Sequence, residues 1–368
     1  MKKLLFFGSD YNVGLTTALT EQILELQQLP GLELTVLSSE NEMEPGLQEQ
    51  LRHAGVFVKL VPGLDEHQNF TRLAAVIGDT ISERAIELVN VHNNWQLALV
   101  IGVRLGPWAK RSFKTIYTIH GYRHNSPWKS WLAILIIGGA LRLFADRVIS
   151  MSGFVSKKFW FLRDKTDVVY YIMKKPEFNK TENQLSTAEL RLVFPAQFRP
   201  GKNQERLIPV IADYISATGD TSIRVWLPGA GETLSRCCEL VHSLGLDEQV
   251  IFPGRLSHRE VIALYEQANI GLAMTNIETY GRCIAEPFAL GRCVISRRTG
   301  IAEDIIRQGE NGFLFNTEAE LLAILLELHD HPERIAGCGN QAFADKAMFS
   351  AQAVMTSYLQ VLDKAMAK

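Results

Sequence analysis

The stretch over residues 268–296 constrains the fold most, because its pattern fits one local arrangement. Residues 268–274 form an apolar run of the length of a buried strand, and residues 292–296 form another. Between these runs Ile284 and Phe288, each followed by an alanine, recur at helical spacing. The pattern predicts a strand, a loop, a helix and a second strand. In open α/β sheets, the loop that follows the first strand of such a unit lies where ligands bind.

The chemistry of this loop favours an anion flanked by hydroxyl groups. A helix beginning near Gly281 directs unpaired backbone N–H groups, and about half a positive charge, at what precedes it. A diphosphate suits that position, and Gly281 lets it approach the backbone closely. Glu286 lies roughly 7.5 Å along the helix, far enough from the anion to accept hydrogen bonds from a ribose. Glu278, in the loop, is placed to accept them from sugar hydroxyls.

With these residues in view, the stretch resembles the Glu-x7-Glu signature of glycosyltransferase family 4, whose members are retaining enzymes of the GT-B fold. The positions shared with the family pattern are Glu278, Tyr280, Gly281, Glu286, Ala289, Gly291 and Val294. The chain departs from it at Pro287, where Ala is usual, and at Cys293, where Pro is usual. The resemblance implies an α/β chain of two Rossmann-like doubly wound parallel-sheet domains facing an interdomain cleft. It also implies a nucleoside diphosphate sugar as donor substrate, with no metal and no cofactor.

Other segments match the family in outline. A strand-like run ends in His120, where family members carry a His that faces the transferred sugar; the alternative is a structural His at a strand end. Arg199 and Lys202 follow another strand, where the family has an Arg and a Lys on the donor diphosphate; the alternative is a solvated pair. The resemblance thus implies His120 and Glu278 as catalytic residues. The donor-binding residues it implies are Gly14, Arg199, Lys202, Gly229, Arg255, Gly281, Arg282, Cys283 and Glu286.

The length of 368 residues predicts two domains, and strands alternating with helices predict doubly wound sheets. The polar run over residues 179–188 is the best candidate for a linker. We therefore expect an N-terminal acceptor-binding domain over residues 1–183 and a C-terminal nucleotide-sugar-binding domain over residues 184–345. Residues 346–368 are expected to form a helix that crosses back to the first domain, as in the family.

The composition limits the classes of binding partner and the cellular compartment that we expect. The formal charge of −2 gives no global attraction to nucleic acid, and none is expected as a partner. Five cysteines without metal-ligand spacing fit free thiols in a reducing compartment, so we expect a cytoplasmic protein. No run reaches the ~20 apolar residues that a membrane span needs.

Charge is concentrated in one region. Between residues 100 and 175 there are 14 Lys and Arg against three Asp, a net charge of +11. Basic residues interleaved with aromatic ones over residues 104–175 suit an anionic membrane surface, so the protein is expected at the inner face of the cytoplasmic membrane. Within this region, residues 131–141 are apolar on all sides and are expected to form a buried helix.

The function predicted from these features is transfer of a hexosyl group, with retention, from a UDP- or GDP-sugar to a hydroxyl of a glycan or lipid-linked acceptor. Such a reaction belongs to the assembly of cell-surface polysaccharide or lipopolysaccharide. Two alternatives remain. One is a nucleotide-sugar epimerase on the same fold, and the other is an inactive relative that acts as a binding subunit.

Overall fold

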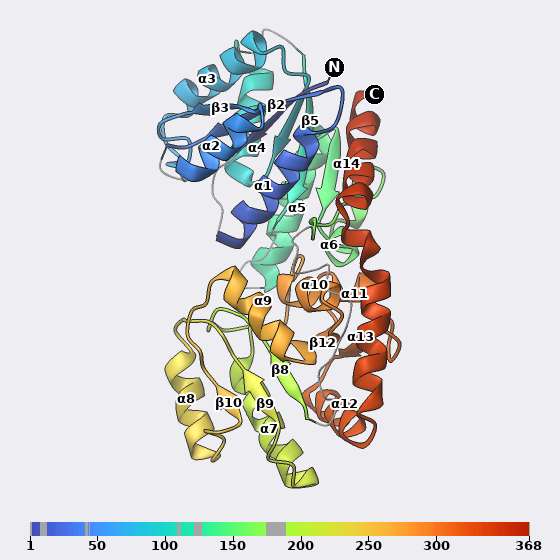
Figure 1. Ribbon diagram of the computed structural model, residues 1–368. Helices are drawn as coiled ribbons and strands as arrows, with labels where there is room; N and C mark the ends of the chain where they lie inside the picture. The colour runs from blue at the N-terminus through green and yellow to red at the C-terminus, as the bar shows by residue number, and fades with distance from the viewer. Residues whose placement is uncertain are drawn as a thin grey trace. The chain divides into compact units, whose positions relative to one another are not determined.

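The computed structural model describes residues 2–7, 13–40, 43, 45–108, 112–120, 127–173 and 189–367, without the side chains of residues 13–18, 45 and 127–130. The chain forms two compact units (Figure 1). Unit 1 comprises Met1–Ile172 together with Ala351–Lys368, and unit 2 comprises Met173–Ser350. The chain thus changes unit at 172/173 and 350/351, where the sequence suggested 183/184 and 345/346. The expected linker, residues 179–188, lies outside the described residues.

Unit 1 is a parallel sheet whose strands are joined by helices. In chain order its elements are β1 (Lys2–Phe7), α1 (Val13–Gln27), β2 (Leu32–Ser38), α2 (Pro45–His53), β3 (Phe57–Leu60), α3 (Phe70–Glu83), β4 (Leu88–Val91), α4 (Asn94–Leu105), β5 (Lys114–Ile119), α5 (Pro127–Phe144), β6 (Arg147–Ser150), α6 (Gly153–Lys158), η1 (Trp160–Leu162), β7 (Thr166–Val168) and the returning α14 (Ala351–Met366). The strands lie in the order β3-β2-β1-β4-β5-β6-β7 and all pair in parallel. The order reverses between β1 and β4, which is the switch point of a doubly wound sheet.

Unit 2 repeats this plan. Its elements are β8 (Arg191–Val193), α7 (Gln204–Thr218), β9 (Arg224–Trp226), α8 (Leu234–Ser243), β10 (Val250–Ile251), α9 (His258–Gln267), β11 (Ile270–Ala273), α10 (Arg282–Ala289), β12 (Cys293–Arg297), α11 (Ala302–Ile305), β13 (Gly312–Phe315), α12 (Glu318–Asp330), α13 (Glu333–Asp345) and η3 (Lys346–Phe349). The strand order is β10-β9-β8-β11-β12-β13, again parallel, and it reverses between β8 and β11. Two Rossmann-like parallel-sheet domains were expected, and this expectation is confirmed.

The strands are buried because helices flank each sheet. Every residue of β4, β6, β11 and β13 is buried. Strands covered on both faces read as continuous apolar runs rather than as alternating ones. This pattern is why the strand, loop, helix and strand expected around residues 268–296 are found there as β11, α10 and β12.

The helix expected to be buried at residues 131–141 is exposed, and that expectation was wrong. In α5 the side chains of Trp131, Leu132, Leu135 and Ile136 are 47–65% exposed. The helix packs on unit 1 along a narrow strip that includes Leu141 and Gly138, where an added Cβ would lie 2.2 Å from Phe161. A helix that is apolar on all sides is expected to be covered on all sides. How much of its surface is covered depends on the tertiary packing, which the sequence pattern does not give.

The last helix, α14, belongs to unit 1, where it packs against α1, β5 and β6 (Figure 1). The side chains of Asn90 and Tyr358 meet in the interior, with Asn90 Nδ2 donating to Tyr358 Oη at 2.7 Å. Thr118 Oγ1 donates in turn to Asn90 Oδ1 at 3.0 Å. This buried polar network fixes α14 to the centre of the sheet, because each of its groups needs its partner.

Candidate active site

At the switch point of unit 2, the loops after β8 and β11 are joined by hydrogen bonds. Asn203 Nδ2 donates to Met274 O at 2.8 Å and to Asn276 Oδ1 at 2.7 Å. The backbone N–H of Asn276 donates to Gly201 O at 3.0 Å. Loops at the carboxyl ends of strands that flank a switch point form the ligand crevice of this fold. The two loops carry Lys202 and Glu278, and the bonds through Asn203 fix their spacing.

Glu278 is paired with a cation. Its carboxylate forms an ion pair with Lys202, and both side chains are largely buried, at 17% and 15% exposed. The backbone N–H of Glu278 donates to Thr299 Oγ1 at 2.8 Å. An added Cβ on Gly300 would lie 2.5 Å from Tyr280 O, so the loop after β12 can approach this closely only with glycine there. Glu278 is therefore held by its side chain and by its backbone.

The helix α10 begins at Gly281, which has a φ of 96° and caps the helix without a side chain. The N–H groups of Ile284 and Ala285 both donate to Gly281 O, at 2.9 and 3.1 Å. Burial, and then the nearby charge of Glu278, raise the pKa of the Cys283 thiol to about 12. Cys283 is thus a neutral thiol at the helix start, and an anion placed there would meet the helix dipole rather than a thiolate.

Glu286, one turn further along α10, is 3% exposed and bonded to two cationic or protonatable groups. Arg282 Nε donates to Glu286 Oε1 at 2.7 Å, and His258 Nε2 lies 2.9 Å from the same oxygen. Burial raises the pKa of this carboxyl, but the attraction of Arg282 and His258 outweighs it, so the net pKa is lowered. Every hydrogen bond that the described residues make to this carboxylate goes to Oε1. Oε2 is left as an acceptor.

Four other residues that were expected to bind the donor make none of these side-chain contacts with Lys202, Glu278 or Glu286. Arg199 and Arg255 are exposed, and their guanidinium groups make no ion pair with the described residues. Gly229 donates its backbone N–H to Gly254 O at 2.8 Å, and a Cβ on it would lie 2.0 Å from Ala196 O. Its structural role is therefore close packing of two loops. Gly14 lies in the first turn of α1, and the loop before that helix, residues 8–12, is outside the described residues.

In unit 1 the expected catalytic His120 follows β5 and is the middle member of a hydrogen-bonded chain. Its Nε2 lies 2.9 Å from His92 Nδ1, and its Nδ1 lies 2.9 Å from Tyr171 Oη. Burial lowers the pKa of His120 from its usual range to about 4. Burial and then His120 lower the pKa of His92 as well. Both imidazoles are neutral at pH 7, which allows one ring nitrogen to donate to the other.

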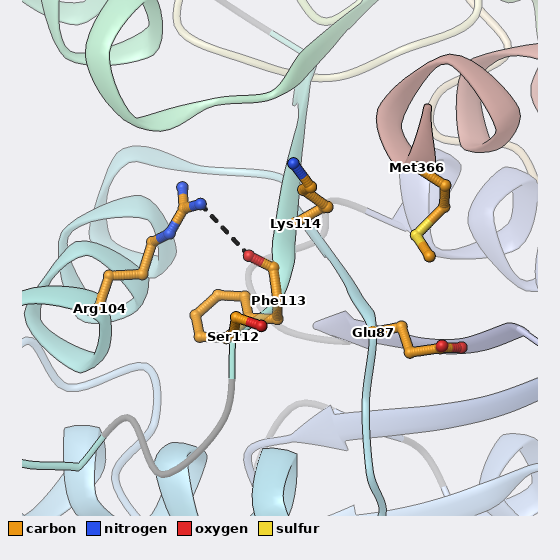
Figure 2. A pocket seen from close by; sticks show the side chains of 6 residues that line it. All are labelled: Glu87, Arg104, Ser112, Phe113, Lys114 and Met366. Carbon is orange, nitrogen blue, oxygen red and sulfur yellow. Dashed lines mark hydrogen bonds between the residues drawn. The ribbon is translucent and has the colours of Figure 1, made fainter. Parts of the chain in front are cut away.

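Unit 1 also has a cavity of about 370 Å³, lined by Glu87, Arg104, Ser112, Phe113, Lys114 and Met366 (Figure 2). It lies at the amino ends of β4 and β5, opposite the edge where ligands bind in such sheets. Its cations have partners within the protein: Arg104 donates to Phe113 O at 3.3 Å, and both Arg104 and Lys114 pair with Asp146. We assign no ligand to it.

The structure brings the predicted residues Lys202 and Glu278 together, and it adds three supporting residues. Asn203, His258 and Thr299 had no assigned role, yet they position Lys202, Glu286 and Glu278. Asn203 and Thr299 lie in the loops that follow β8 and β12, and His258 is the first residue of α9. Among the described residues, no three His, Cys, Asp or Glu side chains are grouped as a metal site requires.

Comparison with known proteins gives relatives that match over part of their length. A protein of Bacillus subtilis (strain 168) that is named as the glycosyltransferase EpsD is 25% identical over 255 residues. The match covers 64% of this chain and 66% of the relative. The N-acetyl-alpha-D-glucosaminyl L-malate synthase of Bacillus anthracis is 24% identical over 161 residues, 44% of this chain and 38% of the relative. The matches thus span less than two thirds of each relative's length.

Solved structures match over the whole chain. The UDP and glucose complex of Anabaena Alr3699/HepE has a TM-score of 0.76 at 19% identity, covering 99% of this chain and 100% of that one. The lipopolysaccharide outer core galactosyltransferase WaaB, in its apo form, has a TM-score of 0.77 at 13% identity, covering 99% of each. The paired Rossmann-like units and this likeness define the class, which is the GT-B fold. Residues 176–342 match the model of the glycosyl transferases group 1. The expected family resemblance is confirmed.

Proposed function

We propose that the protein is a glycosyltransferase that moves a hexosyl group from a nucleoside diphosphate sugar to a hydroxyl, with retention at the anomeric carbon. One observation carries the proposal. The start of α10 lies between two carboxylates in different settings, Glu278 paired with Lys202 and Glu286 held by Arg282 and His258. This arrangement suits a diphosphate with hydroxyl groups on either side.

The nucleoside end of the donor is assigned to Glu286. A ribose has two neighbouring hydroxyl donors, and an ionised carboxylate is an acceptor only. The lowered pKa of Glu286 keeps it ionised at neutral pH. Its Oε1 is occupied by Arg282 and His258, so the ribose would bond to Oε2.

The diphosphate is assigned to Arg199, Lys202 and the start of α10. In the transfer, the bond from the anomeric carbon to the diphosphate oxygen breaks, and its electron pair leaves with the diphosphate. The acceptor hydroxyl oxygen bonds to the same face of that carbon and transfers its proton to the departing diphosphate oxygen. Cations and helix N–H groups aimed at the departing oxygens stabilise this charge most when it is largest, in the transition state. The Arg199 side chain is exposed and makes no ion pair with the described residues, so it can turn toward the donor. We propose that these groups act without a metal ion.

His120 is proposed to contact the transferred sugar. Its pKa of about 4 makes it a neutral hydrogen-bonding group at pH 7, which suits a sugar hydroxyl. Its bonds to His92 and Tyr171 fix the orientation of the ring. His92 and Tyr171 are therefore positioning residues in this proposal.

The acceptor is proposed to be a glycan or a lipid-linked glycan, in polysaccharide or lipopolysaccharide assembly. The structural neighbour HepE was solved with UDP and glucose, and WaaB is named for the lipopolysaccharide outer core. The cysteines of this chain are free thiols, in keeping with a cytoplasmic site of action. We also propose that residues 104–175 carry a surface for an anionic membrane.

The proposal is tested by thermal shift against UDP-, GDP- and dTDP-sugars, followed by product analysis with the stabilising donor. We expect one nucleotide family to raise the unfolding temperature. Glu286→Ala should weaken donor binding by about tenfold or more, the value of one lost charge-assisted hydrogen-bond pair. His120→Ala should lower turnover more than donor affinity. Glu239→Ala, at an exposed position of α8, is the matched control and should change neither.

Two outcomes would contradict the transferase. Unchanged turnover in both the Glu286 and the His120 variants would remove the assigned site. Release of free or epimerised sugar without any need for an acceptor would identify an epimerase instead.

A further inference from the structure

One helix of unit 1 has a largely apolar face in contact with solvent, in which Arg142 is the one charged side chain among the described residues. The α5 face consists of Trp131, Leu132, Leu135, Ile136 and Leu143, each between 47% and 77% exposed. At 3.6 residues per turn, these five positions fall within about 140° of the helix circumference. Large apolar patches on a soluble surface mark a site of interaction, because leaving them in water is unfavourable.

A second aromatic side chain extends this surface. The 3-10 helix η1 packs against α5 at Gly138, where Phe161 leaves no room for a Cβ. Trp160, the residue before Phe161, contacts its ring edge-on and is 63% exposed. The α5 face therefore has a tryptophan at its start, Trp131, and another beside it. Tryptophan favours the boundary between hydrocarbon and water, since its ring is apolar and its N–H is polar.

The charges around the α5 face are basic. The helix contains no Asp or Glu. Lys157 and Lys158, at the end of α6, and Arg163, directly after η1, are exposed. Lys158 lies 5.1 Å over the ring of Phe154, which directs a cation alongside an aromatic surface. Arg142 is paired with Asp164 at 2.5 Å, so the positive charge of this arginine is partly offset.

We propose that the α5 face inserts into the outer part of a lipid bilayer that contains anionic lipid, with Lys157, Lys158 and Arg163 contacting its headgroups. The apolar side chains enter the acyl boundary, as in interfacial helices that lie in the plane of a membrane. In the part of the chain that the structure describes, no helix is long and apolar enough to cross a membrane.

A second copy of the chain fits this surface less well. Two identical faces related by a two-fold axis would bring the two basic rims together. Residues 100–175 carry a net charge of +11, so the rims would repel each other, whereas an anionic lipid surface attracts them. Charge complementarity therefore favours anionic lipid, rather than a second copy of the chain, as the partner of the α5 face.

The test is flotation of the full-length protein with vesicles of phosphatidylcholine alone, or with about 30% phosphatidylglycerol, at low and at moderate salt. It needs no donor, acceptor or turnover, so its result is independent of the transferase proposal. We expect the wild type to bind the anionic vesicles and to bind the neutral ones at least tenfold more weakly. The double variant Leu135→Gln/Ile136→Gln should lower the partition coefficient at least tenfold. Leu244→Gln, which changes a similarly exposed leucine in unit 2, should leave it unchanged.

A second pair of substitutions separates charge from apolar contact. Lys157→Gln/Lys158→Gln should weaken binding severalfold at low salt and much less at moderate salt, because the salt already screens that attraction. All these positions are exposed, so the unfolding temperature of each variant should stay near that of the wild type.

Three results would overturn the proposal. They are no flotation of the wild type at low salt, equal flotation of the Leu135/Ile136 variant, and equal binding to neutral and anionic vesicles. A dimer that the Leu135/Ile136 variant abolishes, without vesicle binding, would instead assign the α5 face to a second copy.

Discussion

Glu278 and Glu286 are alike in the sequence but differ in their surroundings. Glu278 shares its charge with one lysine and keeps some contact with solvent. Glu286 is buried, and its ionised state depends on Arg282 and His258 together. Removing either partner of a buried, hydrogen-bonded charge leaves the other uncompensated. Substitution of Arg282 is therefore expected to disturb the ionisation and orientation of the Glu286 carboxylate, in addition to any contact that Arg282 makes with a ligand.

His120 gives a prediction about pH. Its pKa is about 4 in the folded protein and 6.5 as the ordinary value, so between these values the unfolded chain binds a proton that the folded chain does not. The free energy of unfolding should therefore fall as pH falls from 6.5 toward 4, by on the order of 3 kcal/mol for this residue. His92, whose pKa is also lowered, acts in the same direction.

Denaturant unfolding between pH 5 and 7.5 measures this slope. His120→Gln should flatten it, and His53→Gln, at an exposed side chain, should not. An equal slope in the wild type and the His120 variant would show that burial of this imidazole does not control the acid sensitivity.

At the scale of elements, β11 and α10 are adapted to one proline. Pro287 lies inside α10 and has no N–H to donate to Cys283 O, the carbonyl four residues earlier. Tyr265 Oη donates to that carbonyl at 3.4 Å. Gly271 in β11 leaves room for the proline ring, since a Cβ there would lie 2.4 Å from Pro287 Cβ. The departure from the family pattern at this position is thus compensated by two neighbouring residues.

This packing makes opposite predictions for two glycines. Gly271→Ala should destabilise the protein by about 1–3 kcal/mol, the usual cost of overpacking a core. Gly337→Ala, on the exposed side of α13 with no atom within 4 Å of the new Cβ, should stabilise it by about 0.4–1 kcal/mol. Chemical denaturation measures both. Equal effects of the two substitutions would contradict the packing argument.

At the scale of the whole molecule, unit 1 is built from two separate parts of the chain. Its sheet comes from the first 172 residues. The chain then runs through unit 2, Met173–Ser350, before α14 returns to unit 1. Asn90 and Tyr358, which bond to each other, are 268 positions apart. Unit 1 can therefore be completed only when the end of the chain is available.

The anchoring of α14 gives a prediction of its own. Tyr358→Phe removes the hydroxyl that accepts from buried Asn90, and we expect a loss of about 1–3 kcal/mol in the free energy of unfolding. Lys364, also on α14, forms a surface ion pair with Asp167 of β7. Lys364→Gln removes this pair and should cost less than about 1 kcal/mol. Urea unfolding compares the two. A larger cost for the lysine would show that surface charge, not the buried network, holds α14.

The sequence predicted the α10 region well because its information is local. The apolar runs, the helical spacing of Ile284 and Phe288, and Gly281 all act within one strand, loop and helix. The supporting contacts were harder to predict. His258 meets Glu286 across 28 positions, and Lys202 meets Glu278 across 76, so neither pair appears as a pattern in the chain.

The sequence by itself determined the doubly wound parallel sheets and the position of the carboxylates around Gly281. Hydrophobic periodicity and glycine placement act over a few residues, and they are enough to fix those features. Only the tertiary structure decided which oxygen of Glu286 stays open, that His120 lies in a hydrogen-bonded chain with His92 and Tyr171, and that α5 presents an apolar face to solvent. Burial and pairing depend on residues far apart in the chain that packing brings together, and a linear pattern does not encode which side of a helix will be covered.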